Sequence, residues 1–149
     1  MPRQSPTLRP RSGFSLIEML IAVTLLGLLL AIAAPRVREA ATRQDVRSAR
    51  AAVANLYARA RIHAVQRRVP VTLQFGDSTA WITTPLGAGL DTIGAVEHLG
   101  RQFGVSVGAP GSVSISPVGM VNAGTPIVVS FTRSGHSDSV VISGYGRLQ

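Results

Sequence analysis

Hydrophobic residues dominate one long stretch near the start of the chain. No charged residue occurs from Met19 to Ala34, and with residues 14–18 the stretch covers 21 positions. As an α-helix rising 1.5 Å per residue it is about 31 Å long, close to the roughly 30 Å hydrocarbon core of a bilayer. The pattern therefore predicts a membrane-spanning helix.

Two other structures produce a similar pattern, namely a buried core helix and a cleaved secretory signal peptide. Arginines at positions 3, 9 and 11 precede the stretch, as in a signal peptide. However, the stretch is longer than the usual apolar region of a signal peptide and carries Glu18 near its start. After Ala34 it continues into Pro35 and a helical pattern instead of a polar cleavage region. We therefore favour a retained membrane helix.

Beyond Pro35, the spacing of apolar residues predicts that the helix continues through residues 36–68. Apolar side chains recur every three or four residues, which places them on one helical face. They are Val46, Ala49, Val53, Leu56, Ala60 and Ala64. Pro35 is expected to kink the helix, because its ring removes a backbone donor and crowds the carbonyl of Ala31. Arg67-Arg68-Val69-Pro70 is expected to end the helix.

After residue 69 the hydrophobic period changes to two, which predicts strands with one buried face. The predicted strands cover residues 71–75, 79–84, 103–107, 113–115, 127–131 and 140–142. Turn-rich loops are expected at residues 87–89, 108–111, 119–124 and 134–138. The predicted fold class is α+β, with a long N-terminal transmembrane helix packed by its second half on an antiparallel β-sheet of about five to seven strands.

Composition restricts the chemistry of the chain. Its 149 residues include no cysteine, which excludes disulfides and zinc–thiolate sites. The apolar fraction of 46% is too high for a disordered chain. The formal net charge is +8, and residues 36–68 hold nine of the fifteen arginines, whereas residues 69–149 are nearly neutral. The basic character therefore belongs to the start of the chain and to the second half of the predicted helix.

The arginine-rich helix segment has three interpretations. Arg43, Arg47 and Arg50 share one helical face. In the first interpretation this face is solvated or faces other subunits, in the second it contacts anionic lipid, and in the third it contacts nucleic-acid phosphates. Tyr57 is the only aromatic residue in the segment, so the stacking expected of a nucleic-acid site is missing. We favour the first interpretation and do not expect nucleic acid as a partner. Trp81 and Phe103 are expected in the core.

The sequence does not predict an enzyme. His136, Asp138 and the neighbouring serines offer the residue types of a catalytic triad, but they crowd a single turn and cannot easily point at one another. Asp91, Glu97 and His98 are expected on a solvated loop, so no metal site is predicted. No glycine-rich phosphate loop with a lysine is present. We expect no cofactor.

The residues Gly13-Phe14-Ser15-Leu16-Ile17-Glu18, with the basic residues before them and the apolar span after them, resemble the prepilin signal of type IV pilins and type II secretion pseudopilins. The resemblance implies that a prepilin peptidase cleaves after Gly13 and methylates the new N-terminus at Phe14. It also implies other minor and major pseudopilins, an inner-membrane assembly platform and membrane lipid as partners.

Three shorter motifs are similar to the GspH/FimT-type minor pilins. They are Gln66-Arg67-Arg68-Val69-Pro70-Val71-Thr72-Leu73, Ile115-Ser116-Pro117-Val118-Gly119 and Gly146-Arg147-Leu148. The resemblance implies a minor pseudopilin of a type II secretion system, a structural subunit of the pseudopilus tip that acts in protein secretion across the outer membrane. A type IV pilus minor pilin linked to DNA uptake is the alternative, and a binding module for DNA or a secreted substrate is a third class.

Some pilus members of this group are implicated in DNA uptake through a basic Gly-Arg-x-Arg motif near the C-terminus. The matching residues here are Gly146, Arg147, Leu148 and Gln149, so the second basic position is occupied by glutamine. Arg147 is the candidate nucleic-acid contact that this resemblance implies.

Glu18 is the candidate assembly residue. A charge within an apolar span costs about 2.5 to 3.5 kcal/mol on insertion scales, so it requires water or a cationic partner. After cleavage, Phe14 presents a new α-amine, and Glu18 of one subunit can neutralise this amine on a neighbour. The alternative is that Glu18, which lies close to the membrane boundary, extends to the lipid headgroups.

The predicted organisation is a leader at residues 1–13, a transmembrane and assembly helix at 14–35, an amphipathic extension at 36–68 and a periplasmic β-sheet domain at 69–149. Membrane orientation presents a conflict, because the arginines after the span outnumber those before it and favour the opposite topology. The family resemblance implies a cytoplasmic leader and a single-pass inner-membrane protein with a periplasmic C-terminal domain. We follow the resemblance.

Overall fold

The computed structural model describes residues 15–86, 89–109, 111–121, 123 and 125–149. It divides the chain into two compact units, residues 1–38 and residues 39–149. Helix α1 (Leu16–Arg67) contributes its first part to unit 1 and its second part to unit 2.

The described part of unit 1 is a single stretch of α1. Every residue from Ser15 to Arg38 is exposed, including the long aliphatic side chains. This stretch is long and apolar enough to cross a membrane, and none of its most apolar window is buried in protein. Pro35 lies inside α1, and the predicted kink at this residue remains a prediction.

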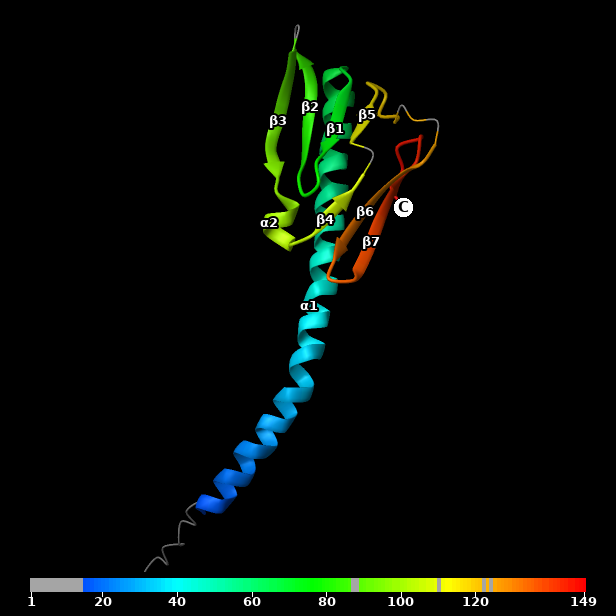
Figure 1. Cartoon of the computed structure of the whole chain (residues 1–149). Coiled ribbons are helices and arrows are strands. Elements are labelled where there is room, and N and C mark those ends of the chain that lie inside the picture. Colours follow the sequence, from blue (N-terminus) through cyan, green and yellow to red (C-terminus); the bar gives the residue numbers. More distant parts are fainter. Residues whose placement is uncertain (1–14, 87–88, 110, 122, 124) are drawn as a thin grey trace, which may run out of the picture. The chain divides into compact units, whose positions relative to one another are not determined.

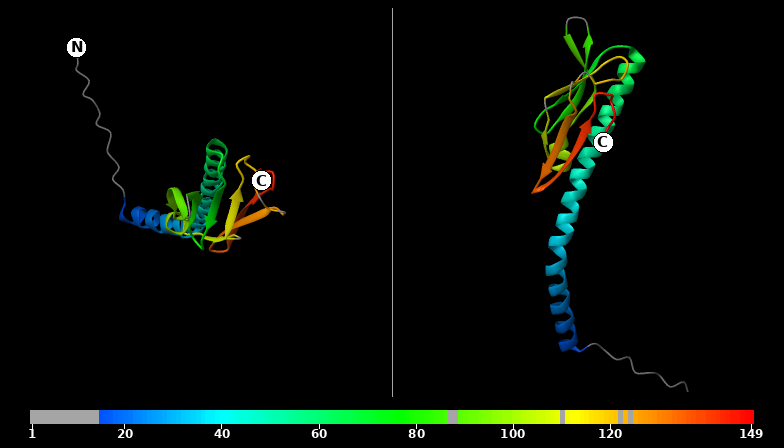
Figure 2. Two further views of the ribbon diagram at one scale, coloured as in Figure 1. Left: turned by 90° about the horizontal axis from the view of Figure 1, so that it is seen from above. Right: turned by 90° about the vertical axis from the view of Figure 1, so that its right-hand side faces the viewer.

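Unit 2 places two antiparallel sheets beside the second half of α1, as the two sets of views show (Figure 1 and Figure 2). Its elements after α1 are β1 (Val71–Phe75), β2 (Ala80–Leu86), β3 (Gly89–Glu97), α2 (Leu99–Phe103), β4 (Ser106–Gly108), β5 (Ser112–Ile115), β6 (Ile127–Arg133) and β7 (His136–Ile142). The strand order is β3-β2-β1-β5 in one sheet and β4-β6-β7 in the other. The expected α+β architecture is therefore confirmed, with two sheets where one was expected.

The core of unit 2 lies between α1 and the sheets. All six residues of the predicted apolar face are buried, and Tyr57 joins them at 2% exposure. The alternating residues of β1 and β6 face the same core, for example Leu73 and Phe131, both fully buried. Helical and strand periodicity therefore identified the buried faces correctly. Trp81 was expected in the core but is partly exposed, whereas Phe103 is partly buried and packs against the core.

Two boundaries predicted from the sequence are wrong. The strand expected at residues 103–107 begins only at Ser106, because Phe103 belongs to α2 and Gly104 ends that helix at a left-handed φ of 65°. The loop expected at 134–138 is shorter, because β7 already begins at His136. Ser134 and Gly135 both have positive φ angles, 47° and 81°, which closes a tight hairpin that pairs Arg133 with His136.

Strand β3 was not predicted. Its side chains are exposed or only partly buried, so it lacks the alternation that identifies a half-buried strand. It is the edge strand of its sheet and pairs only with β2. Asp91 and Glu97 therefore lie on a strand and not on a loop, and His98 directly precedes α2 without a side-chain capping hydrogen bond.

Candidate functional site

The N-terminal segment holds the residues that the sequence assigned to processing and assembly. Gly13 and Phe14 lie outside the described residues. Glu18 lies in the first turn of α1, where a negative charge interacts favourably with the helix dipole. Within the part of the chain that the structure describes, no ion pair of Glu18 is found. The Glu18 side chain is exposed.

Around Glu18, unit 1 presents a continuous apolar surface. Twelve large aliphatic side chains between Leu16 and Ile32 are 51% to 83% exposed. Burying such a side chain fully contributes about 1.5 to 3 kcal/mol. A helix with this surface requires lipid or other apolar helices around it.

The arginine-rich part of α1 forms ion pairs with the strands of unit 2. Arg50 lies 3.5 Å from the Asp138 carboxylate in β7, and Arg59 lies 2.7 Å from Glu97 in β3. Arg133 of β6 pairs with Asp45 of α1 and also donates a hydrogen bond of 2.5 Å to the Phe103 carbonyl. Sequence reasoning missed these pairs, because the partners lie far apart in the chain.

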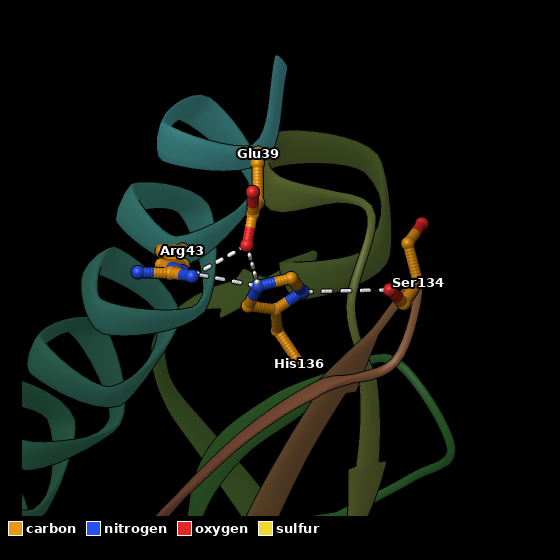
Figure 3. Close-up of polar contacts among 4 residues, drawn as sticks. All are labelled: Glu39, Arg43, Ser134 and His136. Atoms are coloured by element: carbon orange, nitrogen blue, oxygen red, sulfur yellow. Dashed lines mark hydrogen bonds and ion pairs between the residues drawn. The ribbon is translucent and has the colours of Figure 1, made fainter. Parts of the chain in front are cut away.

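A second polar cluster joins α1 to the β6–β7 hairpin (Figure 3). Arg43 contacts the Glu39 carboxylate at 2.5 Å and donates a hydrogen bond from Nε to His136 Nε2 at 3.1 Å. His136 Nε2 also lies 3.6 Å from Glu39 Oε1, and its Nδ1 lies 3.4 Å from the Ser134 carbonyl oxygen. These contacts use both ring nitrogens of His136.

The same contacts exclude the catalytic triad that the residue types near His136 suggested. Its ring faces Arg43, Glu39 and a backbone carbonyl, while Asp138 pairs with Arg50. No group of three or more metal-ligating side chains occurs among the residues that the structure describes. Glu97, one of the candidate metal ligands, is paired with Arg59.

The C-terminal Gly146-Arg147 pair lies against the second half of α1. Gly146 is buried at a φ of 74°, and a Cβ at this position would lie 2.6 Å from the Gly119 carbonyl oxygen and 3.0 Å from the Tyr57 hydroxyl. Arg61 donates a hydrogen bond of 3.3 Å to the Gly146 carbonyl. Glycine is therefore required here for close packing as well as for backbone conformation.

Arg147 is exposed and lines a cavity of about 390 Å³ together with Arg61, Tyr57 and Leu148. The Tyr57 hydroxyl is buried and has no hydrogen-bond partner among the described residues. Burial raises the pKa of the Tyr57 hydroxyl above its usual value, and the nearby Arg61 partly offsets this increase. The two arginines give this surface a positive charge.

Comparison with known proteins bears on the N-terminal segment and on the fold. Residues 8–34 match the family described as the prokaryotic N-terminal methylation motif. The crystal structure of the type IV minor pilin FimU of Pseudomonas aeruginosa PAO1 in space group P21 is similar, with 16% identity and a TM-score of 0.60 over 72% of this chain and 88% of that one. The fold of this chain is pilin-like. The long helix packed on antiparallel sheets is the pilin-like α+β fold.

A second FimU structure, in space group P65, is similar with 17% identity and a TM-score of 0.55 over 69% of this pilin-like chain and 90% of that chain. No curated protein sequence matches the chain significantly. The methylation motif implies processing by a prepilin peptidase and covers the predicted processing residues, Gly13 and Phe14, and Glu18. The motif match is confined to the N-terminal segment, and the similarity to the FimU structures shows the fold of the chain.

Proposed function

We propose that this chain is a minor subunit of a pilin-like filament, the pseudopilus of a type II secretion system, and that it acts in protein secretion across the outer membrane. The observation that carries the proposal is the apolar helix of unit 1, uncovered along its whole described length and bearing one carboxylate, Glu18, within the methylation motif. The resemblance to GspH/FimT-type minor pilins supports a place at the filament tip.

Processing and assembly are coupled through charge. Cleavage after Gly13 exposes the amine of Phe14, and Glu18 of one subunit pairs with this amine on its neighbour. N-methylation retains the positive charge of the amine. A paired carboxylate avoids much of the roughly 2.5 to 3.5 kcal/mol that an isolated charge costs in an apolar environment. The pair therefore favours subunits that have been processed.

Membrane insertion precedes assembly in this proposal. The apolar stretch of α1 anchors the subunit in the inner membrane, with the leader in the cytoplasm and unit 2 in the periplasm. The aliphatic side chains of unit 1 then exchange lipid for the helices of neighbouring subunits. The partners are the prepilin peptidase, other minor and major pseudopilins and the inner-membrane assembly platform.

A type IV pilus minor pilin is the second candidate. It is favoured by the structural similarity to FimU, which is itself a type IV minor pilin. In that case Arg147 and Arg61, which line one cavity, are the candidate contacts for DNA phosphates. Deletion of the gene in the source bacterium distinguishes the two systems. Loss of extracellular enzymes with intact pili supports a role in type II secretion. Loss of pili with intact secretion supports a role in the type IV pilus.

The assembly role of Glu18 is tested by replacing it with alanine and, as a charge-matched control, with aspartate. We expect Glu18→Ala to be processed normally but to lose crosslinking to neighbouring subunits, whereas Glu18→Asp retains part of it. Membrane insertion, measured by resistance to alkaline extraction, is the control that each variant is still anchored in the membrane. Unchanged crosslinking of Glu18→Ala in the presence of the full filament machinery would remove the pairing role.

A further inference from the structure

The tip of the β6–β7 hairpin is held on α1 mainly by polar contacts. The hairpin contributes Val129, Phe131, Val140 and Ile142 to the hydrophobic core. Residues 133–139, which form the tip, contribute none. Next to the tip, Val46, Arg47, His136 and neighbouring residues line a hollow of about 320 Å³. Apolar packing therefore contributes little to holding the tip in place.

We infer that this hairpin tip is held on the first turns of α1 in unit 2 in a proton-sensitive way. Protonation of His136 releases it. The inference is independent of the proposed function, because every contact that it uses lies within residues 39–149. Histidine is the side chain that ordinarily changes charge between pH 5 and 8, and its neutral ring can accept one hydrogen bond while donating another.

The observed contacts fit the neutral ring. Nε2 accepts a hydrogen bond from Arg43 Nε at 3.1 Å, which leaves Nδ1 to carry the proton beside the Ser134 carbonyl at 3.4 Å. One neutral tautomer satisfies both contacts. When Nε2 is protonated it loses its acceptor character and places a cation beside the Arg43 guanidinium.

The surrounding charges decide the direction of the response. The charged residues around His136 are Glu39, Arg43 and Arg47 from α1 and Asp138 from its own strand. Arg133 is its register partner in β6. Glu39, the nearest carboxylate, already pairs with Arg43, Asp138 pairs with Arg50, and Arg133 pairs with Asp45.

A protonated His136 is therefore an excess cation. Its Nε2 lies 3.1 Å from Arg43 Nε and 3.6 Å from Glu39 Oε1, so the charged atom group nearest to the new proton is a cation. Arg47, which has no ion-pair partner among the described residues, lines the same hollow as His136 and is a further cation there. Acid is expected to release the hairpin tip from α1.

The test measures the separation of hairpin and helix directly. Because the chain has no cysteine, Ala51→Cys and Ser137→Cys introduce one pair of spin labels at exposed sites of the full chain in detergent. Double electron–electron resonance is recorded at pH 8 and pH 5.5, where ordinary carboxylates stay ionised. Since one hydrogen bond is lost, we expect the fraction at long distance to rise about three- to tenfold in acid.

Two variants in the labelled background assign the response. His136→Gln offers an amide oxygen to Arg43 at every pH, so its distance distribution should not change between pH 8 and pH 5.5. Glu39→Gln removes the nearest anion, so its acid response should exceed that of the parent chain. A parent distribution that does not change with pH, or a His136→Gln variant that still opens in acid, overturns the inference.

Discussion

Replacing Gly146 with alanine tests the packing of the C-terminal segment on α1. The new Cβ would lie 2.6 Å from the Gly119 carbonyl oxygen, which is backbone and cannot rotate away, and 3.0 Å from the Tyr57 hydroxyl. The φ of 74° adds the cost of a left-handed conformation, about 1 to 2 kcal/mol for a residue with a Cβ. Overpacking contributes about a further 1 to 3 kcal/mol.

Gly135→Ala is the matched control for this variant. Gly135 has a similar φ of 81°, but nothing lies within 4 Å of its Cβ position. It should therefore lose only the conformational part, about 1 to 2 kcal/mol. Thermal unfolding of both full-length variants in the same detergent, followed by near-ultraviolet circular dichroism, gives the difference. Equal destabilisation of the two variants would refute the close contact between Gly146, Gly119 and Tyr57.

Three further changes test other contacts of unit 2. Tyr57→Phe removes a buried hydroxyl without a described partner, so the unfolding free energy at pH 7 should not fall by more than about 1 kcal/mol. Burial raises the pKa of Tyr57, so the unfolded chain releases this proton at a lower pH than the folded chain does. The wild type should therefore lose stability as pH rises above about 10. Denaturant titrations of Tyr57→Phe should lack this loss. Asp45→Asn should cost under about 1 kcal/mol in the same titrations, since both partners of its ion pair are about one-third exposed. Arg133→Met should cost more, about 1.5 to 3 kcal/mol, because Arg133 also binds the Phe103 carbonyl, and equal losses for the last two variants would contradict this assignment.

The sequence predicted the parts of the fold that periodicity controls. Helical spacing identified the buried face of α1 from Val46 to Ala64, and alternation identified the inner faces of β1 and β6. It could not identify β3, whose side chains are largely exposed on both faces. It also misplaced the starts of β4 and β7, where positive φ angles at Gly104, Ser134 and Gly135 set the boundaries.

The candidate sites also differ in whether the sequence could predict them. The processing and assembly residues could be proposed from sequence, because they form one contiguous motif that ends at Glu18. The ionic contacts could not, because each joins residues distant in the chain, such as Asp45 with Arg133. The role of Gly146 also depends on contacts with Tyr57 and Gly119 that only the folded chain brings together.

The most direct test of the assembly mechanism is mass spectrometry of the protein purified from the membranes of its own bacterium. We predict a mature chain that begins at Phe14 and carries one additional methyl group on its N-terminal amine. A chain that begins at Met1, or one cut near Ala34, would lack the amine that Glu18 is proposed to neutralise and would contradict the mechanism.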